Sequence, residues 1–299
     1  MIAMFTPAEI EACSRLVALA LAEDLGTAGD LTSQAVIPED LEGQAVFVSR
    51  EAGVLAGLQA AEMVCRAVDS TLEFEVVRRD GEVVGKGKLI ARLSGAMQSI
   101  LAAERTALNF LQHLSGIATL TRRYVDAVAG APPDGKNPQI LATRKTIPGW
   151  RLLAKYAVQC GGGLRHRSGL HDGVLVKDNH LAALADATDP IATAIAAVRA
   201  AHTPGSGVFV EVEVDSLEQL DRALLTDVHA ILLDNMSLDQ MRDAVDRRNA
   251  VSPGITLEAS GGITLSNVRA VAETGVDRIS VGALTHSAPA LDIALDYVS

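Results

Sequence analysis

The chain is poor in aromatic residues, in cysteine and in long apolar runs. Aromatic residues make up 3% of the 299 positions, so Ala, Val, Leu and Ile must build the core, as the hydrophobic fraction of 48% allows. The three cysteines, Cys13, Cys65 and Cys160, are widely spaced and form no CxxC pair, which argues against a disulfide framework or a zinc site and fits a reducing cytoplasm. No apolar run reaches the ~18 residues that span a bilayer, and the start of the chain lacks the pattern of a signal peptide. We therefore expect a cytoplasmic protein without a membrane partner.

Positive charge is also scarce, except in one stretch. The formal net charge is −11, which argues against nucleic acid as a partner. Residues 142–180 nevertheless carry seven Lys and Arg against two acids, a local excess of +5. The cations of this stretch are Arg144, Lys145, Arg151, Lys155, Arg165, Arg167 and Lys177. Such a concentration on an acidic chain favours a pocket for a polyanion, with a solvated charged face as the alternative.

The first third of the chain predicts an α+β arrangement. Thr6-Pro7-Ala8-Glu9 is typical of a helix start, with Thr6 as cap and Glu9 completing a capping box, and the helix should run to about Asp24. Two strands are expected within 44–57, a helix near 58–68, and strands within 71–95 around an Asp80-Gly81 turn. A longer helix is expected over 98–129, with Gly116 as a place where it breaks or bends.

After residue 138 short apolar strands alternate with Ala-rich helical segments. Strands are expected at 139–144, 173–178, 207–214, 230–235, 255–262 and 278–283, and helices at 184–201, 216–226, 237–249 and 266–274. Alternation of this kind predicts a parallel sheet with right-handed crossovers. Six units favour an α/β barrel short of the usual eight strands, with a doubly wound open sheet as the alternative. No G-x-G-x-x-G motif opens a helix after a strand, so a dinucleotide fold is not supported.

Polar or small residues close each of the expected strands. In order these are Thr143-Arg144-Lys145, Lys177-Asp178, Glu211 and Glu213, Asp234-Asn235, Ser260-Gly261-Gly262 and Gly282-Ala283. Active sites of α/β barrels lie at the carboxyl ends of the strands, so we expect these groups to surround one site.

The last two strand ends favour phosphate binding, because small residues let backbone N–H groups approach an anion. Glycines of ordinary tight turns are the alternative. Glu213 and Asp234 are placed to hold Mg²⁺, partly through water or substrate, or to bind ribose hydroxyls, and each alone could equally be an ion-pair partner.

The cations of this site exceed what one phosphate needs. Arg144, Arg167 and Lys177 favour a second anionic ligand, such as a carboxylate, because Arg binds planar carboxylates through two hydrogen bonds. His166 is either structural or part of the same binding group, and its position beside Arg167 after the glycines 161–163 favours binding.

Several long motifs occur in the order found in one enzyme family. They are EDLG..GDLTS (23–33), ERTALNFLQHLSGIAT (104–119), TRKTIPGWRLLAKYAV (143–158), GGGLRHRSGLHD (161–172), KDNH (177–180), EVEV (211–214), LLDN (232–235), SGGI (260–263) and VGALTHSAPALD (281–292). On these motifs the sequence closely resembles the quinolinate phosphoribosyltransferases, over nearly its whole length.

The resemblance implies an N-terminal α+β sandwich domain, residues 1–115, and an open, roughly six-stranded α/β barrel, residues 116–299, with an N-terminal helix that can pack on the barrel. It also implies a homodimer or higher homo-oligomer with a shared active site, to which Arg105 of a neighbouring subunit contributes. From the residues alone, Arg105 could equally be a surface side chain.

Position by position, the resemblance also implies the site residues. The substrate-binding residues it implies are Arg105, Thr143, Arg144, Lys145, His166, Arg167, Lys177, Glu213, Asp234, Ser260, Gly261, Gly262, Gly282 and Ala283. Among them Lys145, Lys177, Glu213 and Asp234 are the expected catalytic residues, and Glu213 and Asp234 the expected acids near Mg²⁺. Two positions depart from the family pattern. Ala142 stands where Asp often precedes TRKT, and Arg165 stands where Asn often precedes HR, which adds a charge near the pocket.

The reaction that the resemblance implies joins quinolinate to 5-phosphoribosyl-1-pyrophosphate, releasing pyrophosphate and CO₂ and forming nicotinate mononucleotide for NAD biosynthesis. After the ring nitrogen attacks the anomeric carbon, that cationic nitrogen accepts the electrons of the departing carboxylate, so Mg²⁺ is the only cofactor expected. Lys145 and Lys177 are candidates for the protonation step. The alternatives are a transferase for a monocarboxylate such as nicotinate, a Schiff-base phosphosugar aldolase or lyase using Lys177, and a non-catalytic binding protein.

Overall fold

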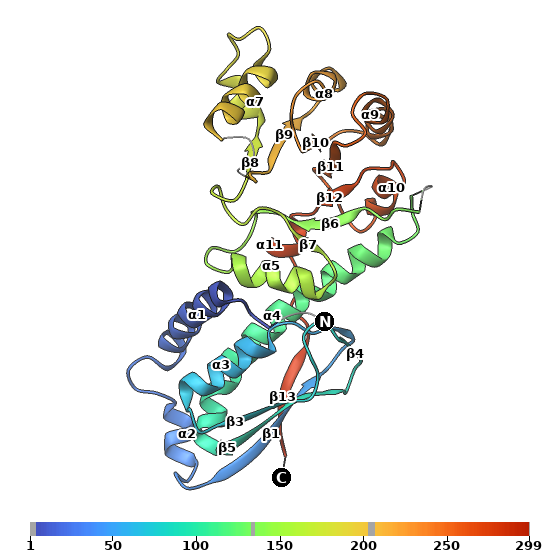
Figure 1. Ribbon diagram of the computed structural model, residues 1–299. Coiled ribbons are helices and arrows are strands. Elements are labelled where there is room, and N and C mark those ends of the chain that lie inside the picture. Colours follow the sequence, from blue (N-terminus) through green and yellow to red (C-terminus); the bar gives the residue numbers. More distant parts are fainter. Residues whose placement is uncertain (1–3, 133–134, 203–206, 299) are drawn as a thin grey trace. The chain divides into compact units, whose positions relative to one another are not determined.

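The computed structural model describes residues 4–132, 135–202 and 207–298 of the chain. The chain forms two compact units, each built from segments that are not contiguous in sequence (Figure 1). Unit 1 comprises residues 1–122, 145–163 and 283–299, and unit 2 comprises residues 123–144 and 164–282. The predicted boundary at residue 115 falls inside one long helix, α4 (Met97–Val128), which supplies residues to both units. No helix of the described residues is long and apolar enough to cross a membrane.

Unit 1 combines helices with a four-stranded antiparallel sheet of order β13-β1-β5-β3. Its elements besides α4 are α1 (Pro7–Leu25), α2 (Leu31–Val36), β1 (Glu42–Ser49), β2 (Gly53–Val54), α3 (Leu58–Val68), β3 (Glu73–Val76), β4 (Val83–Val84), β5 (Leu89–Ala96), α5 (Arg151–Cys160), α11 (Ala283–His286) and β13 (Ile293–Val298). The edge strand β13, which the sequence did not predict, comes from the last residues of the chain and pairs with β1.

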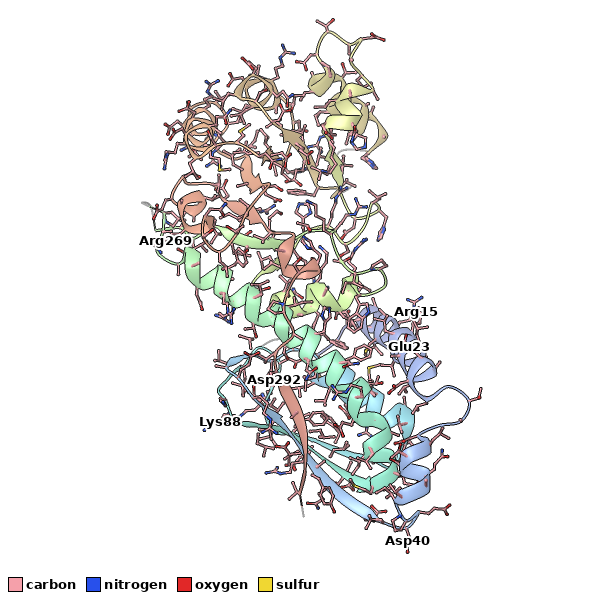
Figure 2. The ribbon with its side chains drawn as sticks, turned by 180° about the vertical axis from the view of Figure 1, so that it is seen from behind. Arg15, Glu23, Asp40, Lys88, Arg269 and Asp292 are labelled. Carbon is pink, nitrogen blue, oxygen red and sulfur yellow. The ribbon has the colours of Figure 1, made fainter. Side chains whose placement is uncertain are left out.

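The predicted capping box begins α1. The Thr6 backbone N–H donates to Glu9 Oε2 at 2.6 Å and the Glu9 N–H donates to Thr6 Oγ1 at 3.4 Å, which satisfies two amides of the first turn. One face of α1 buries Cys13 and Val17 and contacts α3 and α5, all within unit 1. Charged side chains such as Arg15 and Glu23 project from the exposed face (Figure 2).

Asp80 has a different role from the one that the sequence suggested. The strands β3 and β4 flank the Asp80-Gly81 turn as predicted, yet β3 pairs with β5 and β4 pairs with β2. The carboxylate of Asp80 is buried and accepts hydrogen bonds from the N–H groups of Gly57 and Leu58, at the start of α3, and from the Tyr156 hydroxyl at 2.8 Å. It therefore ties the turn to α3 and α5.

The helix does not break at Gly116, because α4 runs unbroken from residue 97 to residue 128. A glycine is needed for a different reason. A Cβ atom at position 116 would lie 2.0 Å from the carbonyl oxygen of Pro289, so the helix packs directly on the backbone of the C-terminal segment.

Unit 2 contains a parallel sheet of seven strands in the order β7-β6-β12-β11-β10-β9-β8. The strands are β6 (Gln139–Ala142), β7 (Leu164–Arg165), β8 (Val174–Val176), β9 (Val210–Val214), β10 (Ala230–Asp234), β11 (Thr256–Ser260) and β12 (Arg278–Ser280), and the helices are α6 (Asp178–Ala182), α7 (Pro190–Ala201), α8 (Leu217–Ala223), α9 (Leu238–Val251) and α10 (Val268–Ala272). The six predicted strands are all present, and β7 is an additional strand of two residues. Because β7 and β8 are the two ends of the strand order, the parallel sheet stays open between them. The alternating strands and helices of this unit therefore form the expected open α/β barrel.

The parallel strands of unit 2 have apolar faces toward their helices and polar groups on the other face. Val210, Val212 and Val214 of β9 are buried, and the intervening Glu211 and Glu213 point the opposite way because side chains alternate along a strand. The end of α4 is joined to this unit by Arg269 of α10, whose Nη1 donates to the carbonyl of Ala127 at 3.4 Å (Figure 2).

Candidate active site

Charged groups collect at the carboxyl ends of the strands of unit 2. Arg144 follows β6, Lys177 follows β8, Glu213 lies near the end of β9, and Asp234 ends β10. Parallel strands direct these ends to one edge of the sheet, which is why residues up to 90 positions apart share a site. The sequence prediction that strand ends mark the site therefore agrees with the topology.

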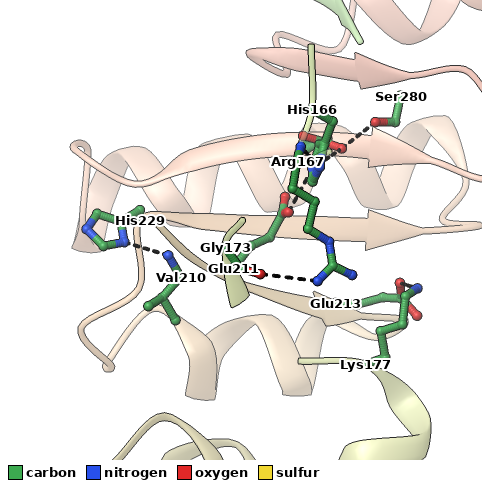
Figure 3. Close-up of polar contacts among 10 residues, drawn as sticks. His166, Arg167, Gly173, Lys177, Val210, Glu211, Glu213, His229 and Ser280 are labelled. Atoms are coloured by element: carbon green, nitrogen blue, oxygen red, sulfur yellow. Dashed lines mark hydrogen bonds and ion pairs between the residues drawn. The ribbon is translucent and has the colours of Figure 1, made fainter. Parts of the chain in front are cut away.

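Cations and carboxylates alternate at this edge. Lys177 Nζ forms a short ion pair with Glu213 Oε2, and Arg167 lies between this pair and the contact of His166 with Glu211 (Figure 3). The Arg167 Nη1 donates to the carbonyl of Gly173 at 3.3 Å. The amine of Lys177 is paired with Glu213, which does not favour Lys177 as the nucleophile of a Schiff-base enzyme.

The surroundings of Arg167 disfavour the charged form of its guanidinium group. Burial, and then the neighbouring guanidinium of Arg144, lower the pKa of Arg167, while Glu211 and Glu213 oppose that shift. Two guanidinium groups this close together, and partly removed from water, are stabilised when an anion binds between them. The pair Arg144 and Arg167 is therefore suited to a carboxylate or a phosphate.

The ends of β10 and β11 form a tight loop pair. Asp234 lies beside Ser260 in the register, and the Asn235 N–H donates to the Ser260 carbonyl at 2.9 Å. Asn235 has φ 54°, the one positive φ of a non-glycine residue in the described chain, and its Nδ2 donates to Asp234 Oδ2 at 2.8 Å. Gly261 has φ 96°, and a Cβ there would lie 2.1 Å from Asn235 Oδ1. Backbone of this kind, without side chains in the way, lets amides approach an anion.

A second group of polar side chains lies on the same face of the sheet, closer to its centre. The sequence singled out its members His166 and Glu211 but not Glu258 or Ser280. Glu211 of β9 and Glu258 of β11 are both fully buried. His166 Nε2 lies 3.0 Å from Glu211 Oε2 and 3.5 Å from Glu258 Oε1, and Ser280 Oγ donates to Glu258 Oε1 at 2.5 Å. A charged residue in the middle of an apolar strand such as TLEAS is a signal that could have found Glu258, because carboxylates are rarely buried without a partner.

Two sets of acids could hold a metal ion. His166, Glu211 and Glu258 offer three ligand atoms within 4.8 Å of one another, the one such group in the described residues. Glu213 and Asp234, the predicted pair, therefore lack a third protein ligand of these types in the described chain. Their oxygen atoms suit Mg²⁺, which usually keeps water and substrate oxygens in its shell.

A cavity of about 510 Å³ extends from the buried polar group toward the amino ends of the strands. Its lining includes His166, Arg167, Glu211, Phe209 and Arg278, and the guanidinium of Arg278 lies 5.5 Å from the centre of the Phe209 ring. Arg165, one of the two departures from the family pattern, is half-buried on β7 and lines this cavity, while Ala142, the other, is fully buried in β6.

The structure does not bring every predicted residue into unit 2. Thr143, Arg144, His166, Arg167, Lys177, Glu213, Asp234, Ser260, Gly261, Gly262 and Gly282 belong to unit 2. Arg105, Lys145 and Ala283 are grouped with unit 1, where Arg105 is exposed on α4, Lys145 is exposed after β6, and Ala283 begins α11. Their role in the site stays a prediction.

Comparisons with known proteins agree on one family. Residues 30–115 match the family model described as quinolinate phosphoribosyl transferase, N-terminal domain, and residues 117–296 match that of the C-terminal domain. The chain is 44% identical over 295 residues to the nicotinate-nucleotide pyrophosphorylase [carboxylating] of Mycobacterium leprae, covering 98% of this chain and 100% of the relative. It is 41% identical to the probable enzyme of the same name from Synechocystis sp., covering 93% and 90% of the two chains.

Solved structures give the same result. The nicotinate-nucleotide pyrophosphorylase of Francisella tularensis superimposes with a TM-score of 0.87 at 37% identity, covering 100% of this chain and 99% of the other. That of Ehrlichia chaffeensis has a TM-score of 0.85 at 37% identity, covering 95% and 98%. The strand-end cations, the alternating acids and the glycine loop thus lie in a chain that is similar to its relatives over nearly its whole length, and the protein belongs to the quinolinate phosphoribosyltransferase family.

Proposed function

We propose that this protein converts quinolinate and 5-phosphoribosyl-1-pyrophosphate to nicotinate mononucleotide, CO₂ and pyrophosphate, a step of NAD biosynthesis. The observation that carries the proposal is the cluster of Arg144, Arg167 and Lys177 against Glu213 at the carboxyl edge of the parallel sheet. Relatives 39–44% identical over nearly the full length carry the names of this activity, which supports the same chemistry here.

The substrates explain the excess of cations. Quinolinate has two carboxylates on adjacent ring carbons, and Arg144 and Arg167 are the groups that would bind them through paired hydrogen bonds. Binding both carboxylates orients the ring nitrogen toward the anomeric carbon, so that an encounter of two substrates becomes a reaction within one complex. A monocarboxylate such as nicotinate would leave part of this charge unmatched.

Glu213 and Asp234 would act on the phosphoribosyl group. Their carboxylates can accept hydrogen bonds from ribose hydroxyls, and their negative charge stabilises the positive charge that develops on the sugar as pyrophosphate leaves. The glycine loop Ser260-Gly261-Gly262, with Gly282 and Ala283, would bind the 5′-phosphate through backbone N–H groups. Lys177, paired with Glu213, stands next to these acids and can neutralise the pyrophosphate oxygens.

A magnesium ion suits Glu213 and Asp234, because both supply hard oxygen ligands and Mg²⁺ usually fills the rest of its shell with water and substrate oxygens. When bound, Mg²⁺ would neutralise charge on the departing pyrophosphate. After the bond to the ribose forms, the quinolinate C2 carboxylate leaves as CO₂ and its electron pair takes up a proton at C2. Lys145 and Lys177 are the candidates to supply that proton.

The assembly and location belong to the same proposal. Arg105 is exposed on α4, as a residue that completes a neighbour's site in a homodimer would be. The three cysteines are free and buried, which supports a reducing cytoplasm.

The test is an assay with quinolinate, 5-phosphoribosyl-1-pyrophosphate and Mg²⁺, in which nicotinate mononucleotide and CO₂ are measured together. Parallel reactions contain nicotinate in place of quinolinate, or EDTA in place of Mg²⁺, and both should be at background. A Lys177→Met variant should lose turnover while the exposed control Lys88→Met keeps it. Absence of CO₂ release by the wild-type protein, or full turnover with EDTA, would contradict the proposal.

A further inference from the structure

The buried polar group of unit 2 lies directly beneath the proposed binding edge. Glu211 precedes Glu213 by two residues and Glu258 precedes Ser260 by two, so each points to the same face as its partner, one step further into the barrel. His166 and Ser280 complete this layer, in which the Glu211 and Glu258 side chains have 1% and 0% exposure and His166 has 13% (Figure 3).

The contacts of His166 define where its proton lies. Its Nδ1 accepts the backbone N–H of Arg167 at 2.8 Å, and a ring nitrogen that accepts carries no proton. The proton of a neutral ring is then on Nε2, which faces Glu211 Oε2 at 3.0 Å and Glu258 Oε1 at 3.5 Å. The ring therefore bridges the buried carboxylates and the backbone of Arg167.

The two glutamates have unused hydrogen-bonding capacity on the other side. Glu211 Oε1 and Glu258 Oε2 are buried and have no hydrogen-bond partner among the described residues. Burial, and then the charge of Glu211, raise the pKa of Glu258 to about 7. Two buried carboxylates this close together lower the stability of the fold. Destabilising arrangements of this kind usually persist where they fix the geometry of a functional group.

We propose that Glu211 and Glu258 are positioning residues, which hold His166 as the Nε2–H tautomer so that its Nδ1 fixes the backbone N–H of Arg167. Because the Arg167 side chain leaves the chain at that same residue, this contact sets the direction in which its guanidinium meets the substrate carboxylate. His166 then acts through Arg167 and need not be a cation itself. The inference deepens the proposed function, on which it rests for the identity of the acid that Arg167 binds.

The first measurement does not depend on activity. In protein labelled with ¹⁵N-histidine, the signals of His166 are identified by their loss in His166→Asn, and the expected pattern has a protonated Nε2 and an unprotonated Nδ1. A doubly protonated ring, or the opposite tautomer, overturns the proposal. One equivalent of a divalent metal that remains after gel filtration and disappears in Glu258→Gln also overturns it, because His166, Glu211 and Glu258 would then be ligands.

The second measurement separates quinolinate binding from the rest of the reaction. Glu211→Ala should raise the KM for quinolinate at least about tenfold, the scale seen when a group that orients a binding residue is removed, and leave the KM for 5-phosphoribosyl-1-pyrophosphate unchanged. Glu211→Gln keeps an acceptor for the Nε2 proton and should recover most of the loss. The matched control is Glu218→Ala on the exposed surface of α8. An unchanged quinolinate KM in Glu211→Ala contradicts the proposal.

A pair of His166 variants covers the case in which an alanine in this layer prevents folding. The side-chain oxygen of Asn can replace Nδ1 as acceptor for the Arg167 N–H, whereas Gln extends its amide toward the Nε2 position. His166→Asn should therefore bind quinolinate more tightly than His166→Gln, and the reverse order refutes the role assigned to Nδ1. If the wild-type protein shows no turnover at all, the proposed function fails, while the ¹⁵N pattern still decides whether the layer holds His166 as described.

Discussion

Two adjacent glycines of the β10–β11 loop pair allow a matched test of the proposed phosphate loop. Gly261 has φ 96° and Gly262 has φ 60°, so an alanine at either position carries a left-handed backbone penalty. The two positions differ in the atoms that an added Cβ would contact. A Cβ at Gly262 meets nothing within 4 Å, whereas one at Gly261 lies 2.1 Å from Asn235 Oδ1 and 2.8 Å from the Asn235 backbone nitrogen.

The difference between the two variants follows from these contacts. Gly262→Ala should lower the free energy of unfolding by about 1 kcal/mol, from backbone strain alone. Gly261→Ala adds a clash that rotates the Asn235 amide away from Asp234 Oδ2, a hydrogen bond worth about 1 kcal/mol, and a backbone shift worth roughly 1–3 kcal/mol. Since about 1 kcal/mol lowers the melting temperature of a domain this size by roughly 2–4 °C, Gly261→Ala should melt several degrees below Gly262→Ala.

Thermal unfolding and steady-state kinetics together check this reasoning. Both variants should remain folded at 25 °C, and Gly261→Ala should raise the KM for 5-phosphoribosyl-1-pyrophosphate while the KM for quinolinate changes little, because only the phosphate-facing loop moves. Equal melting temperatures for the two variants would refute the packing argument. A lower melting temperature for Gly261→Ala with an unchanged KM would show that the loop does not bind the phosphate.

Three further outcomes are expected. Arg167→Lys should raise the KM for quinolinate about tenfold, roughly 1.4 kcal/mol, because Lys cannot make the paired hydrogen bonds of Arg, with Arg242→Lys on exposed α9 as control; equal KM values would contradict the binding role. Gly116→Ala should lower the free energy of unfolding by about 2 kcal/mol or more, since its Cβ meets the Pro289 carbonyl oxygen at 2.0 Å, whereas Gly254→Ala, with nothing within 4 Å, should not; calorimetry decides. Glu258 faces Glu211, His166 and Arg278, and its pKa is raised in the folded protein, so its contribution to stability is fully present below about pH 4.5 and is lost as the pH rises to about 7. Glu258→Gln should therefore remove up to about 1.4 kcal/mol per pH unit from the slope of unfolding free energy against pH in this window. Urea unfolding at several pH values measures this slope, and an unchanged slope would contradict the prediction.

The sequence predicted the parallel strands of unit 2 better than any other part of the fold. The alternation of short apolar runs with Ala-rich segments predicted all six longer strands, because parallel strands buried against helices are read from local apolar content. The polar residues after those strands predicted that charged groups gather at one edge of the sheet, since the topology of a parallel sheet brings carboxyl ends together whatever the loops between them.

The pairing of strands that are far apart in the sequence could not be predicted. The strand β13 joins β1 across about 250 residues, and nothing local in Ile293–Val298 specifies that partner. β7 has two residues, too few for any periodicity. Glu258 was missed for another reason: a carboxylate within a strand is ordinarily expected on a solvent face, whereas Glu258 is fully buried.

The opening between β7 and β8 has a consequence for how the specificity for the pyridine carboxylic acid could change. β7 is joined to the sheet through two residue pairs with β6 alone, and β8 through three with β9. The connection that carries His166 and Arg167 thus begins at the most weakly anchored strand of the sheet, and residues there can be exchanged without breaking the pairing of the five inner strands. Arg165, where the family often has Asn, is a change of this kind. In a laboratory selection for new pyridine acids, accepted substitutions should therefore accumulate in residues 164–173 before they appear in β9–β12.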